Sequence, residues 1–194
     1  MRFSRLCGSA IVTFTVFVAA AAEQPGPTVE YLGMCDASAA TAISANKFIV
    51  ANDEDNVLRI YQRNQPNSLQ SIDLTVFLNV NLDHPEADIE GVTRLGERLF
   101  WIASHGRNKF GKLRPNRHRL FATDIAVEGD KVLVFPFGQP YFKLLEQLSK
   151  APKLAKYELS KAAQRAPEAA GGLNIEGLAA HQKAPSNRFS KSDP

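Results

Sequence analysis

Cysteine is scarce in this sequence, whose 194 residues contain only Cys7 and Cys35. Cys7 lies in an N-terminal apolar run that we expect to be removed, so one thiol would remain. A single thiol cannot form an intrachain disulfide, and the folded part must therefore be stabilised by its hydrophobic core. Because Cys35 stands among Leu32, Met34 and Ala37, we expect it to be a small buried residue rather than a nucleophile.

Signature motifs of catalysis are also missing. The sequence contains no Gly-x-Ser-x-Gly, no glycine-rich phosphate-binding loop and no His-Glu-x-x-His, which removes common hydrolase, nucleotide-binding and metalloprotease patterns. Ser104 and His105 are neighbours, but consecutive side chains of a strand leave on opposite faces and cannot form a nucleophile and base pair. The sequence does not decide whether the protein is an enzyme.

Net charge is small as well. The 23 Lys and Arg against 20 Asp and Glu give a formal charge of +3 at pH 7, which falls to +1 without Arg2 and Arg5. Such a balance produces no global field that would attract nucleic acid or a membrane surface. We therefore expect no nucleic-acid partner and no membrane association of the mature chain, so only local charge can indicate function.

The N-terminus has the order of a secretory signal peptide. Two arginines precede an uncharged run over residues 6–22, and a polar, proline-broken stretch follows at 23–27. Small residues at Ala20 and Ala22 satisfy the signal peptidase rule, so we predict a signal peptide over 1–22, cleaved near Ala22, and a periplasmic or secreted protein. The alternative is a retained anchor, but the run contains glycine, serine and threonine and is less apolar than a spanning helix.

From residue 28 onwards, short apolar runs alternate with turn residues, which is typical of antiparallel hairpins. The segment 141–170 departs from this pattern, because it is rich in Leu, Lys, Ala and Glu, and Pro152 and Pro167 divide it into short helices. The sequence thus predicts a mainly β domain over 23–180 with a helical insertion near 141–170, and a polar tail, 181–194, that we expect to be disordered. The predicted strands cover 48–51, 57–61, 69–77, 99–103, 120–127 and 131–137.

A weak internal repeat relates these strands. A shift of 52 residues places 36–41 on 88–93 and 48–51 on 100–103, and a further copy begins at 174–179. Repeats of roughly 40 to 50 residues with about four strands each are typical of β-propeller blades. We therefore predict a partial propeller-like domain of antiparallel four-stranded units, with the first strand of a third unit. Because propellers have at least four blades, we expect either a C-terminally truncated chain or a wrong repeat interpretation.

Acidic residues gather at the start of the predicted units, most densely over 83–90. Alternate positions of a strand share a face, so Asp88 and Glu90 would point together into a central channel. Carboxylates converging there could bind a divalent cation such as calcium, or act as a general acid and base. The alternative is a structural role in capping turns or joining units. The candidate metal ligands are Asp36, Asp88, Glu90 and Glu176.

A second acidic stretch, 52–56, reads Asn-Asp-Glu-Asp-Asn and resembles a calcium-binding loop in composition. It lacks the ligand spacing and the distal glutamate of an EF-hand. We therefore predict a plain acidic hairpin turn here.

A basic loop, defined as residues 104–119, bridges two predicted strands. It contains six Lys or Arg, two His and no acid, and a loop of this length is usually functional or mobile. Arginine makes forked contacts with phosphate or carboxylate, so we predict an anionic small molecule as partner. The alternative is a structural network with nearby acids. The candidate ligand-binding residues are His105, Arg107, Asn108, Lys109, Arg114, Asn116, Arg117 and His118.

Five segments, 33–38, 51–59, 86–91, 101–123 and 173–178, resemble a bacterial exported family known as domain of unknown function 3616. The resemblance implies a propeller-like fold and no established activity. The Ile-Glu-Gly and Glu-Gly-Leu elements are also similar to those of exported phytase-like esterase propellers, which implies acids that bind calcium and basic residues that bind phosphate. A metal-dependent phosphoesterase thus joins the hypotheses, beside a non-enzymatic interaction module and a truncated, non-functional fragment.

Overall fold

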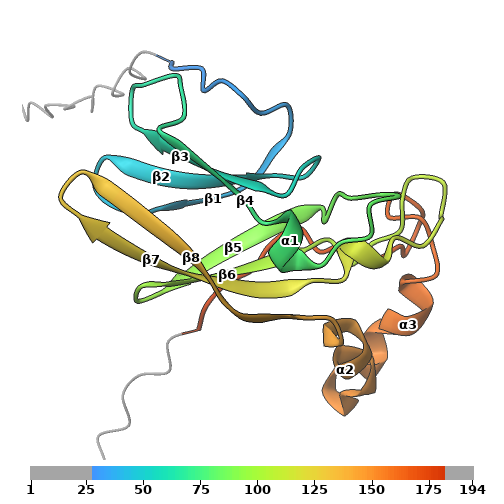
Figure 1. The fold of residues 1–194 in the computed structure, drawn as a ribbon. Helices are drawn as coiled ribbons and strands as arrows, with labels where there is room; N and C mark the ends of the chain where they lie inside the picture. The colour runs from blue at the N-terminus through green and yellow to red at the C-terminus, as the bar shows by residue number, and fades with distance from the viewer. Residues whose placement is uncertain (1–27, 182–194) are drawn as a thin grey trace, which may run out of the picture.

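The computed structural model describes residues 28–181, which form two four-stranded antiparallel sheets and a helical insertion (Figure 1). Each strand pairs with its neighbour in sequence, so both sheets are meanders of hairpins. The first sheet contains β1 Ala37–Ala42, β2 Lys47–Asn52, β3 Val57–Gln62 and β4 Gln70–Asp73. The second contains β5 Ile89–Leu95, β6 Arg98–Ala103, β7 Leu120–Glu128 and β8 Lys131–Tyr141.

This architecture confirms the prediction of a mainly β domain built from antiparallel four-stranded units, and it is consistent with part of a propeller-like fold. The predicted signal peptide, 1–22, lies outside the described residues, as does the tail from 182 to 194. Within residues 28–181, no helix is both long and apolar enough to cross a membrane.

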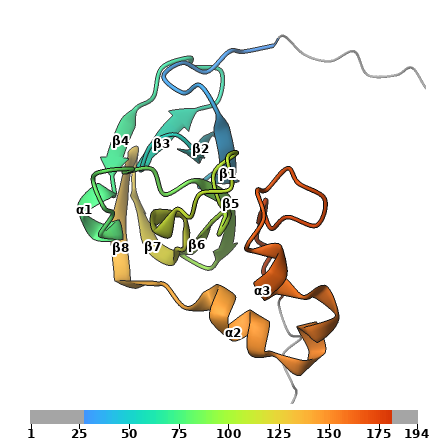
Figure 2. The ribbon, with the colours of Figure 1, turned by 90° about the vertical axis from the view of Figure 1, so that its right-hand side faces the viewer.

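The helices are short and lie at the periphery. The helical insertion extends away from the sheets after β8 (Figure 2), and Pro152 begins a new helix there, as the sequence predicts. Its elements are α2 Leu144–Lys150, the 3-10 helix η2 Pro152–Tyr157 and α3 Leu159–Ala162. Two further short elements are α1 Thr75–Leu78, between the sheets in sequence, and η1 Pro115–Arg117, in the basic loop.

Two local predictions are wrong. The strand expected over 69–77 ends at Asp73, whose Oδ1 accepts a hydrogen bond of 2.8 Å from the Thr75 N–H and so starts α1. The helical turn places Leu74 and Leu78, four positions apart, on one face, and both are fully buried. Cys35, which we expected to be buried, is exposed, because it precedes β1 and stays outside the hydrophobic core.

The hydrophobic core joins the two sheets. Ile49, Leu58 and Ile60 of the first sheet belong to the same buried cluster as Trp101 and Phe121 of the second. The Trp101 indole stacks on the Phe121 ring at a centroid distance of 6.3 Å, and its Nε1 donates a hydrogen bond of 3.0 Å to Thr123 Oγ1. The first strands of the two sheets, β1 and β5, lie side by side next to this core (Figure 2). We call them the inner strands of the two repeated units.

The strand register refines the predicted repeat. Both first hairpins contain a β-bulge, at 37–39 and at 89–91, which agrees with the shift of 52 residues between β1 and β5. Five residues separate the paired Ala42 and Phe48, whereas four separate the corresponding Arg94 and Leu99. The shift between β2 and β6 is therefore 51, and the predicted superposition of 48–51 on 100–103 is displaced by one residue. A displacement of one residue exchanges the two faces of a strand.

Candidate functional site

The acidic and basic segments meet at one end of the two sheets. Every second connection of an antiparallel meander returns to the same end, so the turn at 53–56, the segment 80–88 and the basic loop share that end (Figure 1). The segment 173–178 joins them, because the Ile175 N–H donates a hydrogen bond of 2.8 Å to the Ser104 carbonyl.

Three carboxylates, which we call the carboxylate cluster, converge there. Asp53 follows β2, Asp88 precedes β5 and Glu90 lies in β5, and ligand oxygens of the three side chains lie within 4.8 Å of one another. Glu90 is the extra residue of the bulge between Ile89 and Gly91, a feature that redirects a side chain. Asp88 has a φ of 59°, a left-handed conformation that aspartate tolerates better than most residues.

The first sheet holds β5 in place beside the carboxylate cluster. Ser38 occupies the bulge of β1 that corresponds to Glu90, and its hydroxyl donates a hydrogen bond to the Ile89 carbonyl. Asn52 Oδ1 accepts a hydrogen bond of 3.0 Å from the Asp36 N–H, and the Asp53 N–H donates to the Asp36 carbonyl at 3.2 Å. These contacts position the ends of β1 and β2, and with them Asp53, against the start of the second sheet.

Burial and mutual repulsion perturb the carboxylates. Burial raises the pKa of Glu90 to about 7, and the charges of Asp88, Glu176 and Asp53 add to this effect. Burial also raises the pKa of Asp53. Asp88 is 7% exposed, and burial raises its pKa against the opposing effects of Ser104 and Arg117. Full ionisation of the carboxylate cluster is therefore unfavourable unless a positive charge lies nearby.

Among the basic residues that the structure describes, Arg117 alone forms an ion pair with the carboxylate cluster. Its Nη1 lies 2.8 Å from Asp88 Oδ2, and its Nη2 lies 3.8 Å from Glu86 Oε1. Asp53 Oδ1 and Arg117 Nε are both buried and have no hydrogen-bond partner among the described residues. A buried acceptor without a donor is unfavourable. A cation or a donor group close to Asp53 Oδ1 would therefore stabilise the carboxylate cluster.

Only two of the four predicted metal ligands, Asp88 and Glu90, belong to the cluster. Asp36 and Glu176 are exposed, although Asp36 contributes to the raised pKa of Asp53 and Glu176 to that of Glu90. Asp53 comes from the stretch predicted to be a plain hairpin turn, and sequence reasoning missed it. A signal was present, because Asp53 directly follows an apolar strand at the end where the second unit begins.

Several predicted ligand-binding residues organise the basic loop itself. Asn108 Oδ1 accepts hydrogen bonds from the backbone of Phe110 and Lys112 at 3.1 and 2.8 Å. Asn116 Oδ1 accepts from the Asn81 N–H at 2.9 Å, and its Nδ2 donates to the Asn81 carbonyl at 2.8 Å. Both asparagines therefore stabilise loop conformation through their side chains.

The remaining basic side chains lie around this framework. Arg107 donates hydrogen bonds to the carbonyls of Ala163 and Gly111, at 2.9 and 3.0 Å, and so fastens the basic loop to the helical insertion. Arg114 donates to its neighbouring carbonyl, and Lys109 is exposed. The structure thus brings Arg117 to the carboxylate cluster and gives Arg107 a different partner.

His105 and His118 form a pair of neutral imidazoles. Their ring centroids lie 5.4 Å apart, and His105 Nδ1 lies 2.8 Å from the Ala103 carbonyl while its buried Nε2 has no partner among the described residues. Burial lowers the pKa of His105 and lowers that of His118 to about 4, with the charges of His105, Arg119 and Arg107 adding to the second shift. Both rings can therefore offer an unprotonated nitrogen at neutral pH.

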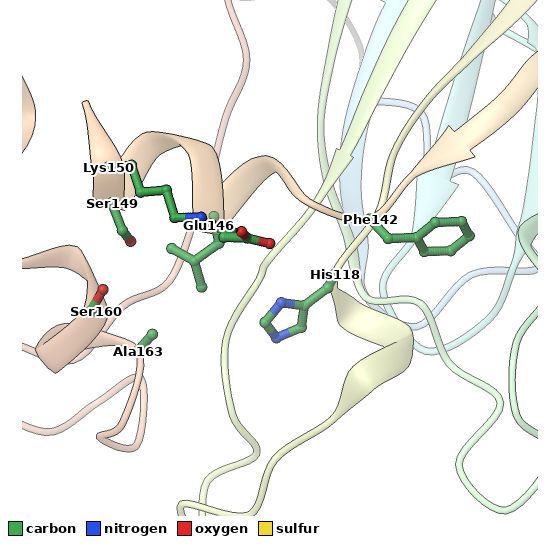
Figure 3. Close-up of a pocket in the computed structure, with 8 residues that line it drawn as sticks. His118, Phe142, Glu146, Ser149, Lys150, Ser160 and Ala163 are labelled. Atoms are coloured by element: carbon green, nitrogen blue, oxygen red, sulfur yellow. Dashed lines mark hydrogen bonds and ion pairs between the residues drawn. The ribbon is translucent and has the colours of Figure 1, made fainter.

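A hollow of about 410 Å³ lies between His118 and the helical insertion. Figure 3 shows the His118 ring pointing towards this insertion, where Lys150 Nζ pairs with Glu146 Oε1 at 2.5 Å. The hollow shares no residue with the carboxylate cluster, and its hydroxyls, imidazole and lysine suit a small polar molecule. It is lined by His118, Phe142, Leu145, Glu146, Ser149, Lys150, Ser160 and Ala163.

The depressed pKa of His118 predicts a loss of stability in mild acid. An unfolded histidine takes up its proton near pH 6.5, whereas folded His118 stays neutral down to about pH 4. Its contribution to stability is therefore complete above about pH 6.5 and disappears as the pH falls towards about 4. Glu90 acts in the opposite direction, because its raised pKa means that the folded state binds a proton first as the pH falls from about 7.

Melting temperatures measured between about pH 7.5 and about pH 4.5 should separate these effects. Replacement of His118 by glutamine removes one titrating group, so the loss of melting temperature with acid should be smaller in H118Q than in the unmodified protein. The matched control is His84→Gln, because the side chain of His84 is exposed. Equal slopes for H118Q and the unmodified protein would contradict the prediction.

Comparison with known proteins places the chain in a family. A search of curated proteins finds no match. The family described as "Protein of unknown function (DUF3616)" matches residues 36–132, which is half of the chain. The matched region runs from just before β1 to the start of β8 and contains the complete carboxylate cluster together with Arg117. The chain therefore belongs to the DUF3616 family of proteins of unknown function.

Proposed function

We propose that this protein binds a divalent cation such as calcium in the carboxylate cluster and uses the bound cation, together with Arg117, to hold an anionic small molecule. The observation that carries the proposal is the convergence of Asp53, Asp88 and Glu90, from two different sheets, to within 4.8 Å. Within residues 28–181, neither Asp53 nor Glu90 forms an ion pair with a basic side chain, whereas Asp88 pairs with Arg117.

The ligand set favours a hard cation. Calcium takes six to eight oxygen ligands and prefers carboxylates and carbonyls, so three carboxylates would leave coordination positions for water or for a bound ligand. A bound cation would also favour the ionised form of Glu90, whose pKa is raised, and would give Asp53 Oδ1 a partner. Export, which stays a prediction from the N-terminal sequence, would place such a site outside the cytoplasm.

Arg117 supports the anionic part of the proposal. Its guanidinium already lies 2.8 Å from Asp88, and its buried Nε has no partner among the described residues. A cation that takes over Asp88 would release donors of this guanidinium for a phosphate or carboxylate group. If the cation also lowered the pKa of a bound water, a phosphate ester held there could be hydrolysed, which is the phosphoesterase form of the hypothesis.

Calorimetric titration of the purified protein with calcium chloride at about pH 8, where Glu90 is ionised, tests the cation site. We expect one site per chain, and Glu90→Gln and Asp53→Asn should each weaken the calcium affinity at least about tenfold because they remove a charged ligand. Glu54→Gln is the matched control, since Glu54 neighbours Asp53 in sequence, is exposed and lies outside the carboxylate cluster. Absence of calcium binding, or an equal loss in the E54Q control, would refute the site.

The anionic ligand needs a second measurement on the calcium-loaded protein. A panel of phosphate monoesters should raise the melting temperature, and Arg117→Gln should remove that increase while calcium binding persists. Released inorganic phosphate, measured in the same samples, distinguishes hydrolysis from binding alone. A panel without any melting shift would remove the anionic ligand from the proposal and leave the cation site standing.

A non-enzymatic interaction role is the second candidate. The observation in its favour is the pair of exposed aromatic side chains, Phe135 and Phe137, on β8 of the second sheet.

A further inference from the structure

The second sheet has an apolar face that points away from the core, which we call the outward face. Strand pairing places Thr93, Phe100, Ala122 and Phe137 in one row across the four strands, and Leu95, Arg98, Asp124 and Phe135 in the next row. Leu95, Phe135 and Phe137 are 40%, 51% and 44% exposed. Large aromatic side chains gathered on one open sheet face are typical of an interaction surface.

The repeat shows that the corresponding face of the first sheet is covered. With the shift of 51 residues between β2 and β6, Ile49 corresponds to Phe100 and Ala51 to Ile102. Ile49 and Ala51 are fully buried in the core that joins the two sheets. In the first sheet, the face that corresponds to the outward face is therefore covered by the second sheet.

A peripheral segment covers one margin of the outward face. A Cβ placed on Gly91 would approach the Gly177 backbone to 2.8 Å, and the Ala180 N–H donates a hydrogen bond of 3.0 Å to Thr93 Oγ1. Residues 177–180 thus lie over β5. No such contact over the aromatic side chains of β8 occurs within residues 28–181, and Phe135 and Phe137 remain open.

The charged residues that strand pairing places on the outward face come in neighbouring pairs of opposite sign, Arg98 with Asp124 and, further along β7 and β8, Lys131 with Glu128. Arg98 Nε and Nη2 donate hydrogen bonds of 2.7 and 3.0 Å to the Asp124 carboxylate, and the Arg98 guanidinium lies 3.2 Å from the centroid of the Phe137 ring. A second copy related by a twofold axis can set its own Asp124 opposite Arg98, and its own Arg98 opposite Asp124. The face is therefore complementary to itself in charge as well as in its apolar character.

We propose that the outward face is the interface of a twofold-symmetric homodimer, in which the second sheets of two copies pack face to face through Phe135, Phe137 and Leu95. Sheets pack in this way at a separation of about 10 Å, with their inner side chains interdigitating. The Arg98 and Asp124 pair would form across the interface as well as within each copy. Because the charges of each copy come in pairs of opposite sign, the contact of two copies would bury no net charge.

Sedimentation equilibrium of the purified protein tests the homodimer. The chain has a mass of 21.3 kDa, and we expect the average mass to rise towards twice the single-chain value between about 1 and about 200 μM. Replacing both Phe135 and Phe137 with lysine should weaken dimerisation at least about tenfold. The matched control, Phe110→Lys, changes an aromatic residue that is 75% exposed on the basic loop and should leave the mass unchanged.

A charge-exchange experiment tests the symmetry. Arg98→Asp alone and Asp124→Arg alone should each be monomeric, because like charges then face each other across the twofold axis. An equimolar mixture of the two variants should recover a dimer, since every facing pair is again of opposite sign. Circular dichroism of each variant checks that it is folded.

Three results would overturn the homodimer. They are a folded, unmodified protein that stays monomeric over the whole concentration range, a dimer that survives the lysine substitutions, and a mixture that shows no recovery. A face that binds a different protein, or further strands of a longer sheet, would give the first of these results.

Discussion

Replacing Trp101 with alanine should lower the free energy of unfolding by about 3–5 kcal/mol, the cost that large aromatic deletions in a core usually carry. Trp101 is fully buried in the cluster that joins the two sheets and stacks on Phe121. Its loss would leave a cavity between the sheets and would leave the Thr123 hydroxyl without the hydrogen bond it now accepts from Nε1. Chemical denaturation measures the change.

The matched control is Phe110→Ala, because this aromatic side chain is 75% exposed and contributes little buried surface. We expect its free energy of unfolding to stay within about 0.5 kcal/mol of the unmodified protein. If W101A and F110A were equally stable, the two sheets would not share the core described above. The carboxylate cluster would then lose its structural basis, because Asp53 and Asp88 meet only when the sheets pack together.

Replacing Arg119 with methionine should cost about 2–4 kcal/mol, because three backbone carbonyl groups, among them that of the buried Leu78, would lose a donor. The Arg119 guanidinium is buried and donates to the carbonyls of Leu78, Asn79 and Pro115 at 2.9, 3.1 and 2.7 Å. Burial lowers its pKa, and no carboxylate within residues 28–181 forms an ion pair with it. Its hydrogen bonds therefore hold the end of α1 against the basic loop.

Arg114→Met is the matched control, since Arg114 lies in the same loop and donates one hydrogen bond, to the adjacent Leu113 carbonyl. Denaturation should show a clear loss for R119M and a small one for R114M. Hydrogen exchange adds a local readout, because the Asn81 amide, which donates to Asn116 Oδ1, should exchange faster in R119M. A protected Asn81 amide together with unchanged stability would show that Arg119 does not hold the end of α1 against the basic loop.

Much of the fold follows from local sequence pattern. The short apolar runs at 57–61 and 120–127, bounded by turn residues, predict strands that the structure contains as β3 and β7, and the Leu-rich, proline-broken stretch predicts the helical insertion. Such features depend on side chains a few positions apart and need no knowledge of distant partners. The end of β4 at Asp73 escaped this reasoning, because the burial of Leu74 and Leu78 is decided by the core around them.

The candidate site divides in the same way. Asp88 and Glu90 could be paired from sequence as alternate positions of a strand, but the structure brings them together through the left-handed φ of Asp88 and the bulge at Glu90. Asn108 and Asn116 could be singled out, but their hydrogen bonds within the loop could not, because these depend on how the backbone of 79–84 and 108–112 folds back. The resemblance to domain of unknown function 3616 predicts the family correctly. It assigns no role to any residue, because no activity is established for that family.

By itself, the sequence determined the antiparallel hairpins, the helical insertion and the match between the inner strands β1 and β5, because each is encoded in the spacing of apolar and turn residues along the chain. The third copy of the repeat, predicted to begin a strand at 174–179, forms no strand in the structure. Only the tertiary structure decided that Asp53 joins Asp88 and Glu90 and that Phe100 lies on the outward face. Asp53 and Asp88 lie 35 positions apart, and their contact depends on the packing of one sheet against another. The hairpin between β5 and β6 is one residue shorter than the hairpin between β1 and β2. This difference turns Phe100 to the opposite face from its counterpart in β2, and it leaves the apolar pattern of the strand unchanged.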